Sequence, residues 1–248
     1  NNGKTPFIIP LIFLLISCSS SRNLEQAMSE PSKVEKLNLS YKDLGTLDIN
    51  IDQFVNLKEL RLFRCKIYSL PAEIGNLTKL EVLVLSDNQL DSLPSSIGNL
   101  KNLKVLSLSY NNLQKLPEQI GNLENLEELK LQFNNLQSLP STIGNLQKLK
   151  TLYLDNNHLQ ALPQSIGNLQ SLHTLTLSRN NLQELPSTLG DLNSLVTLDM
   201  WKAGTMLEMP HSMCRLHNLE YLTVDQNTRI DYCFEIRTNR LDFNLIVK

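Results

Sequence analysis

Residues Leu103 to Asn125 read LKVLSLSYNNLQKLPEQIGNLEN, and the pattern of these letters decides the fold. Leu80 to Asn102 before them and Leu126 to Lys148 after them follow the same pattern, LxxLxLxxNxLxxLPxxIGNLxx, so the sequence repeats every 23 residues. The short LxL alternation in each repeat is the period-2 signature of a half-buried strand. A fixed period of this size predicts a solenoid, in which stacked repeats bury the apolar face that one repeat alone would expose.

The LP pair and the IGNL segment of each repeat resemble the leucine-rich repeat family. The resemblance implies an α/β solenoid, a horseshoe with a parallel concave β-sheet and short helical or irregular segments on the convex side. About nine repeats would fill residues 34–227, and each strand would pair in parallel with the next at about 5 Å. We therefore expect one elongated domain, although a length-based prior would also allow two.

An asparagine recurs at the ninth position of the repeat, where the chain turns off the strand. A buried amide needs hydrogen-bond partners, and the resemblance implies a ladder from these side chains to the backbone of neighbouring repeats. The ladder would comprise Asn88, Asn111, Asn134, Asn157, Asn180 and Asn227. Six of the nine glycines also share one repeat position, which indicates a backbone requirement, and neither GxGxxG nor GxxxxGK is present to suggest a phosphate loop.

The bulk composition excludes one class of partner. A formal net charge of −2 and a charged content of 19% give no basic surface for a phosphate backbone. We expect no nucleic-acid binding.

The N-terminus differs from the repeats. Lys4 precedes a ten-residue apolar run, Phe7 to Ile16, which is too short to span a bilayer and is typical of a secretory signal peptide over residues 1–17. The sequence Leu15 to Cys18 resembles the bacterial lipobox, which implies that Cys18 carries acyl chains such as palmitate. The alternative is an ordinary signal peptide in which Cys18 is incidental.

Lipidation would fix the location of the chain. Two or more acyl chains hold a protein on a bilayer, so the expected location is the bacterial cell envelope, at the outer membrane or cell surface. Residues 18–33 would form the lipidated cysteine and a flexible tether, because they are polar and lack the repeat.

The terminal repeats depart from the pattern. Cys65 occupies an asparagine slot, where a small buried thiol fits, and the repeat from Leu195 is one residue longer than the others. Residues 228–248 would form a C-terminal cap, for which we expect a hairpin around Thr238 and Asn239. Cys214 and Cys233 would be disulfide-bonded in an oxidising compartment, the alternative being two buried thiols.

The sequence offers little for catalysis. The four histidines sit at unrelated repeat positions, with neither a zinc-protease motif nor a metal-like spacing with cysteine, and Gly-x-Ser-x-Gly and kinase signatures are absent. Only about 20 residues follow the last repeat asparagine. We expect no enzyme activity, no cofactor, no metal and no small-molecule substrate.

The variable positions of the concave face are the candidate site for a protein partner, because aromatic and arginine side chains are enriched at binding hot spots. The candidate residues are Tyr41, Arg61, Phe63, Arg64, Tyr110, Lys130, Phe133, Tyr153, Arg179, Trp201, Lys202 and Tyr221. The alternative is that aromatic side chains simply suit a strand surface. Competing functions are a cytoplasmic repeat scaffold, which leaves Phe7 to Cys18 unexplained, a soluble secreted effector, and the ectodomain of a receptor.

Overall fold

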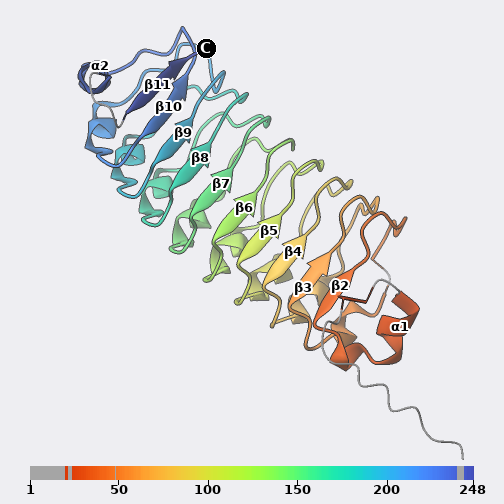
Figure 1. Ribbon diagram of the computed structural model, residues 1–248. Helices are drawn as coiled ribbons and strands as arrows, with labels where there is room; N and C mark the ends of the chain where they lie inside the picture. The colour runs from red at the N-terminus through yellow and green to blue at the C-terminus, as the bar shows by residue number, and fades with distance from the viewer. Residues whose placement is uncertain (1–19, 22–23, 48, 239–242) are drawn as a thin grey trace, which may run out of the picture.

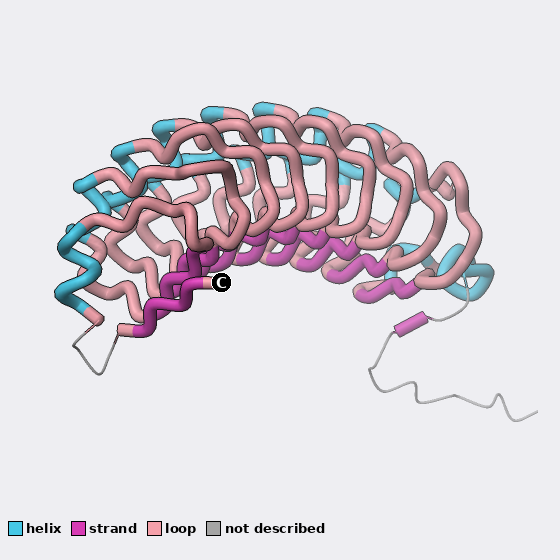
Figure 2. Tube along the Cα trace, turned by 90° about the horizontal axis from the view of Figure 1, so that it is seen from above, coloured by secondary structure: helices cyan, strands magenta, loops and turns pink. Residues whose placement is uncertain are grey.

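The computed structural model describes residues 20–21, 24–47, 49–238 and 243–248. The expected signal peptide and Cys18 lie outside these residues. Within them, the chain forms one parallel sheet whose strands lie side by side in sequence order, from β1 (Ser20–Ser21) to β11 (Asn244–Val247) (Figure 1). The predicted solenoid is therefore confirmed, and the sheet lines the concave side of a curved molecule (Figure 2).

Each repeat contributes one short strand to the sheet. The strands of the repeats are β2 (Lys36–Asn38), β3 (Glu59–Arg61), β4 (Val82–Val84), β5 (Val105–Ser107), β6 (Glu128–Lys130), β7 (Thr151–Tyr153), β8 (Thr174–Thr176), β9 (Thr197–Asp199) and β10 (Tyr221–Val224). The central leucines pair across the sheet, so that Leu106 lies between Leu83 and Leu129. All three are fully buried, because the alternation of the strand turns every second side chain toward the core.

The convex side is built from 3₁₀ helices, one in each of the first eight repeats. They are η2 (Ile51–Gln53), η3 (Ala72–Asn76), η4 (Ser95–Asn99), η5 (Glu118–Asn122), η6 (Ser141–Asn145), η7 (Gln164–Asn168), η8 (Ser187–Asp191) and η9 (His211–Arg215). A Cβ added to Gly121 in η5 would lie 2.3 Å from the carbonyl oxygen of Thr142 in the next repeat. Glycine is therefore required by close stacking, as the repeated position indicated.

The N-terminal segment is more ordered than the expected tether. It contains β1 (Ser20–Ser21), α1 (Leu24–Ser29) and η1 (Pro31–Lys33), and β1 pairs in parallel with β2. Ala27 is 2% exposed, and Leu24 and Met28 pack against the core. The expectation of a flexible tether is wrong for residues 24–33, because three apolar side chains on one face of α1 cover the end of the first repeat.

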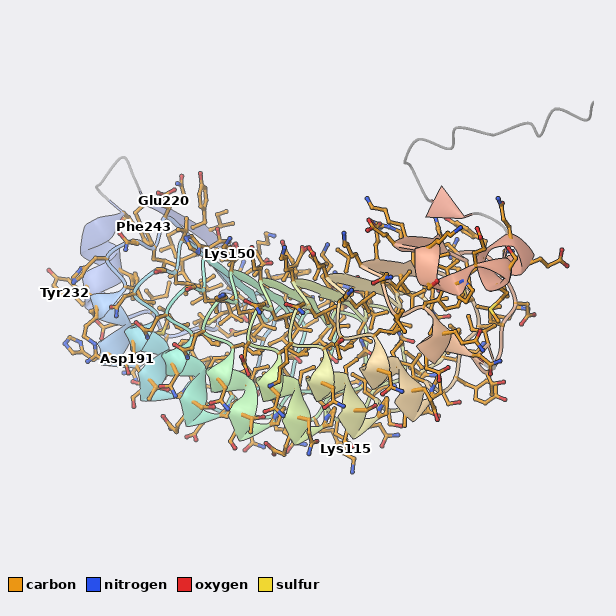
Figure 3. The ribbon with its side chains drawn as sticks, turned by 90° about the horizontal axis from the view of Figure 1, so that it is seen from below. Lys115, Lys150, Asp191, Glu220, Tyr232 and Phe243 are labelled. Atoms are coloured by element: carbon orange, nitrogen blue, oxygen red, sulfur yellow. A yellow bond between two sulfur atoms is a disulfide. The ribbon has the colours of Figure 1, made fainter. Side chains whose placement is uncertain are left out.

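The C-terminal cap also differs from the expected hairpin. After β10 the chain forms α2 (Tyr232–Arg237) and returns as β11 (Asn244–Val247), which pairs in parallel with β10. Phe234 and Phe243 are buried, and Figure 3 places Phe243 at this end of the molecule. A hairpin joins antiparallel strands, whereas a parallel edge is extended only through a longer crossover, here one that contains a helix.

Candidate binding face

The eighth position of each of the first eight repeats has an unusual backbone conformation, with a positive φ angle. Tyr41, Arg64, Tyr110, Phe133 and Arg179 have φ angles of 67°, 54°, 58°, 59° and 56°. The left-handed region costs a non-glycine residue roughly 1–2 kcal/mol, and backbone hydrogen bonds hold it here, as from Tyr110 N to the Gln132 oxygen at 3.0 Å. These five side chains are exposed.

Two aromatic pairs lie along this face. The rings of Tyr110 and Phe133 are stacked, with centroids 4.2 Å apart and planes within 9°. They are 52% and 39% exposed. Nearer the N-terminus, Tyr41 and Phe63 meet edge to face at 5.4 Å, with the Arg64 guanidinium 5.5 Å from the Phe63 ring. Large apolar rings in contact with each other, yet open to solvent, are characteristic of a recognition surface.

Cations gather around the single tryptophan at the other end of the face. Arg179, Lys202 and Lys248 lie 5.0, 4.8 and 5.4 Å from the centre of the Trp201 ring. Lys248 comes from the C-terminal end, just after β11. Trp201, Lys202 and Lys248 border an open hollow of about 520 Å³, which is also lined by Asp225. Cations this close to an indole ring interact favourably with its π system.

An acidic group separates the aromatic and cationic parts. Asp155 accepts hydrogen bonds from Thr176 Oγ1 and from Ser178 N, and Ser178 Oγ donates to Asp199 at 2.7 Å. Burial raises the pKa of Asp155, and the nearby charge of Asp199 acts in the same direction, against the two hydrogen bonds. The face therefore changes along the sheet toward the C-terminus, from an aromatic part through an acidic part to a cationic part.

The remaining candidate residues are held by local ion pairs or partly buried. Arg61 pairs with Glu59 at 2.5 Å, and Lys130 pairs with Glu128 at 2.9 Å. Burial opposes ionisation of Glu59, but hydrogen bonds and charge from Arg61 and Lys36 hold its pKa below the usual value. Tyr153 is half-buried, and Tyr221 is 45% exposed at the start of β10.

Five of the six expected ladder asparagines are buried between repeats. The Asn111 amide nitrogen donates to the Leu85 and Leu108 oxygens at 3.0 and 2.9 Å, and its oxygen accepts from Leu90 N at 3.0 Å. Asn88, Asn134, Asn157 and Asn180 make the equivalent contacts. Asn227 does not belong to this set. It is exposed, and its backbone N–H donates to Asp225, because the next strand, β11, brings no repeat with a matching loop.

The four cysteines divide as follows. Cys214 and Cys233 form a disulfide with Cα atoms 5.9 Å apart. Cys65 is free and fully buried in its asparagine slot, where its thiol donates to the Leu39 oxygen at 3.1 Å and burial raises its pKa. Cys18 lies outside the described residues.

The sequence did not predict one cluster, which comprises His211, Cys214 and Asp231. His211 Nδ1 lies 3.0 Å from Asp231 Oδ2 and 3.7 Å from Cys214 Sγ. A hydrogen bond from Cys233 N, followed by the contact with His211, holds the pKa of Asp231 below its usual value. The His-x-x-Cys spacing within η9 was the available signal, whereas the approach of Asp231 depends on the cap.

Among the described residues, no helix combines the length and apolar character needed to cross a bilayer.

Comparison with family models identifies two matches. The model described as "Leucine-rich repeat region" matches residues 33–111 and 96–180, and the model described as "Leucine Rich Repeat" matches residues 171–192. The first covers more than half of the chain. Comparison with curated proteins gives no significant match.

Comparison with solved structures also finds leucine-rich repeat proteins. A leucine-rich repeat protein of Leptospira interrogans is similar with 34% identity and a TM-score of 0.73, over 86% of this chain and 60% of that one. The plant peptide hormone receptor RGFR1, in complex with RGF2, is similar with 26% identity and a TM-score of 0.68, over 88% of this chain and 40% of that one.

A third match is the ectodomain of the receptor kinase GASSHO1/SCHENGEN3 from Arabidopsis thaliana, in complex with CASPARIAN STRIP INTEGRITY FACTOR 2. It has 30% identity and a TM-score of 0.67, over 91% of this chain and 31% of that one. The chain thus spans from about a third to three fifths of the length of these structures. The repeated sequence, the parallel concave sheet and the family match together show that this chain belongs to the leucine-rich repeat family.

Proposed function

We propose that this chain is an exported, lipid-anchored and non-catalytic module that binds a protein partner on its concave face. The observation that carries the proposal is the exposed, stacked pair Tyr110 and Phe133 on an open sheet. The two plant receptors to which the chain is similar were solved in complex with RGF2 and with CASPARIAN STRIP INTEGRITY FACTOR 2. That supports a binding role for a sheet of this kind.

Two anchors are available on the face, one near the middle of the sheet and one toward its C-terminal end. The stacked aromatic pair offers apolar area, and the cluster of Arg179, Lys202 and Lys248 around Trp201 offers positive charge. Aromatic and arginine side chains supply a large share of binding energy at interfaces. The most complementary partner would present an apolar surface and an acidic surface, separated by the same distance as the aromatic pair and the cations around Trp201.

The binding experiment replaces Phe63, Tyr110, Phe133 and Trp201 by alanine in one variant. These side chains are exposed or half-exposed, so circular dichroism should remain native while capture of the partner from envelope or host extracts is lost. The control variant replaces Tyr68 and Tyr232, which are 52% and 71% exposed and lie outside the strands of the sheet, Tyr232 at the C-terminal end of the molecule (Figure 3). Equal capture by both variants would place the binding site elsewhere.

Export and anchoring rest on the sequence from Phe7 to Cys18. The disulfide between Cys214 and Cys233 supports an oxidising compartment. Labelled palmitate should be incorporated by the wild-type chain expressed in a bacterium, and not by Cys18→Ser. Absence of label in both would favour a soluble secreted protein or a cytoplasmic scaffold.

A further inference from the structure

The cluster beside the disulfide brings metal-ligand chemistry to the C-terminal end of the solenoid. His211 and Cys214 lie three residues apart in η9 (His211–Arg215). A 3₁₀ helix has three residues per turn, so their side chains emerge one above the other. Their ligand atoms, Nδ1 and Sγ, are 3.7 Å apart.

The second half of the cluster comes from the cap. Asp231 directly precedes α2, and its Oδ1 accepts a hydrogen bond from Cys233 N at 3.0 Å. The same carboxylate places Oδ1 3.3 Å from Cys214 Sγ and Oδ2 3.0 Å from His211 Nδ1. The ligand atoms of His211, Cys214 and Asp231 all lie within 4.8 Å of one another, and Cys233 is bonded to Cys214.

These separations suit one metal in particular. Zinc binds cysteine sulfur at about 2.3 Å and histidine nitrogen or carboxylate oxygen at about 2.0–2.2 Å, in a tetrahedron whose ligand atoms are then about 3.3–3.8 Å apart. The three separations among His211, Cys214 and Asp231, from 3.0 to 3.7 Å, already lie close to this range. The sulfurs must first separate, because in the disulfide neither is a thiolate.

We propose that the cap contains a redox-gated Zn²⁺ site, in which His211, Cys214, Asp231 and Cys233 bind the metal when the disulfide is reduced. A dithiol supplies two electrons and two protons, leaving two cysteine thiols and its own disulfide. Zn²⁺ then displaces the two thiol protons, with His211 neutral and Asp231 ionised. Either cross-link, disulfide or metal, joins η9 to the start of α2.

The site explains how the cap could stay attached in both redox states. The disulfide joins residues 19 apart in sequence, and its loss would leave α2 and β11 held to the last repeats by the pairing of β11 with β10 and by the buried Phe234 and Phe243. Metal binding by groups drawn from η9 and from the start of α2 replaces that constraint, because binding free energy to a folded site adds to folding stability.

The test uses the full chain with Cys18→Ser, which removes an unrelated thiol. The protein is reduced with a dithiol, freed of it by anaerobic gel filtration, and titrated with Co²⁺ and then Zn²⁺. Reduced protein should bind about one equivalent of Co²⁺ with thiolate charge-transfer and tetrahedral d–d absorption, which Zn²⁺ displaces. The oxidised protein should show neither band.

Two single variants separate the ligands from their surroundings. His211→Ala should weaken Zn²⁺ binding by more than about tenfold in competition with a chromogenic chelator. His217→Ala is the matched control, since His217 is exposed at the same end of the solenoid and lies outside the cluster. Circular dichroism checks that both variants keep the sheet.

Four outcomes would overturn the proposal. Reduced protein that binds no Co²⁺ would remove the site, and equal binding by oxidised protein would remove the redox gate. Unchanged affinity in His211→Ala would remove the ligand set. Reduced protein that loses its folded signal and does not regain it with Zn²⁺ would also contradict a metal that replaces the disulfide.

Discussion

The repeats from Leu80 to Ser194 and the C-terminal end from Leu195 onward cover their cores in different ways. In the repeats, each asparagine bonds to the repeat before it, and each glycine admits the helix of the repeat after it. At the C-terminal end, Met200 and Met213 fill the core, and a helix, a returning strand and a disulfide replace the missing neighbour.

The difference shows what repetition can and cannot encode. Where each repeat meets a neighbour of the same pattern, one set of contacts recurs at every interface, so the sequence pattern predicts the packing. Ala203 shows the transition, because it occupies the asparagine slot of the last full repeat and contributes only its backbone, as the Leu182 N–H donates to its oxygen at 2.8 Å. Beyond that point the contacts are specific to this chain.

The largest expected loss of stability comes from breaking the asparagine ladder. Asn111→Leu introduces a larger, apolar side chain and leaves the buried Leu90 N–H without its acceptor. It also removes one of the two asparagine hydrogen bonds to each of the Leu85 and Leu108 oxygens. At about 1–3 kcal/mol for the unsatisfied N–H and about 1 kcal/mol for each of the two lost hydrogen bonds, we expect a loss of roughly 4 kcal/mol in unfolding free energy, measured in urea.

Two controls sharpen this prediction. Asn111→Cys should lose less than Asn111→Leu, because Cys65 already makes a thiol hydrogen bond in the equivalent slot. Asn227→Leu, on the exposed side of the comparison, should change stability by less than about 0.5 kcal/mol. Equal losses at Asn111 and Asn227 would contradict the contrast between the two regions.

The next largest effect is a loss of stability confined to the C-terminal end. Replacing Cys214 and Cys233 together by serine removes the cross-link and should cost about 3 kcal/mol. Because the loss is local, hydrogen exchange of amides in β10 and β11 should accelerate while that in β5 to β7 stays unchanged. Uniform acceleration along the sheet would indicate that the cap and the repeats unfold as one unit.

A smaller effect tests the stacking of the convex helices. Gly121→Ala places a Cβ 2.3 Å from a backbone oxygen, and the resulting overpacking should cost about 2 kcal/mol. Gly45→Ala is the comparison, because its Cβ would meet only ordinary contacts, and the φ of +57° should cost about 1 kcal/mol. Thermal unfolding of both variants measures the order of the two effects.

The smallest effect concerns the acidic part of the concave face. Burial raises the folded-state pKa of Asp155 above its ordinary value of 3.8, so the folded chain holds that proton more tightly than the unfolded chain. The contribution to stability is present below the unfolded pKa and is lost as pH rises through the folded pKa. Asp155→Asn should therefore gain stability relative to wild type as pH rises through this window.

Glu81 should behave in the opposite direction. A hydrogen bond and the charge of Lys104, 2.7 Å away, lower its pKa. Its contribution is present above the unfolded pKa and is lost as pH falls through the folded pKa. Glu81→Gln should lose stability relative to wild type at neutral pH and approach wild type in acid, and melting temperatures across pH give both differences.

Much of the fold could be predicted from the sequence, for a local reason. Leu103 to Asn125 sets which side chains are buried, where the strand lies and why the glycine is needed, and identical neighbours repeat that answer along the chain. The choice of concave-face residues also follows from position in the repeat. The stacking of Tyr110 on Phe133 does not, since it depends on how adjacent loops align.

Tertiary structure decided the ends of the molecule. The packing of α1, the parallel return of β11 and the exposure of Asn227 depend on contacts that do not recur from repeat to repeat. The 23-residue sequence pattern therefore could not predict them. Lys248 reaches the Trp201 ring only because β11 extends the sheet. His211 and Asp231 meet across the η9 to α2 junction for the same physical reason: side chains far apart in sequence become neighbours only once the chain has folded back on its last repeat.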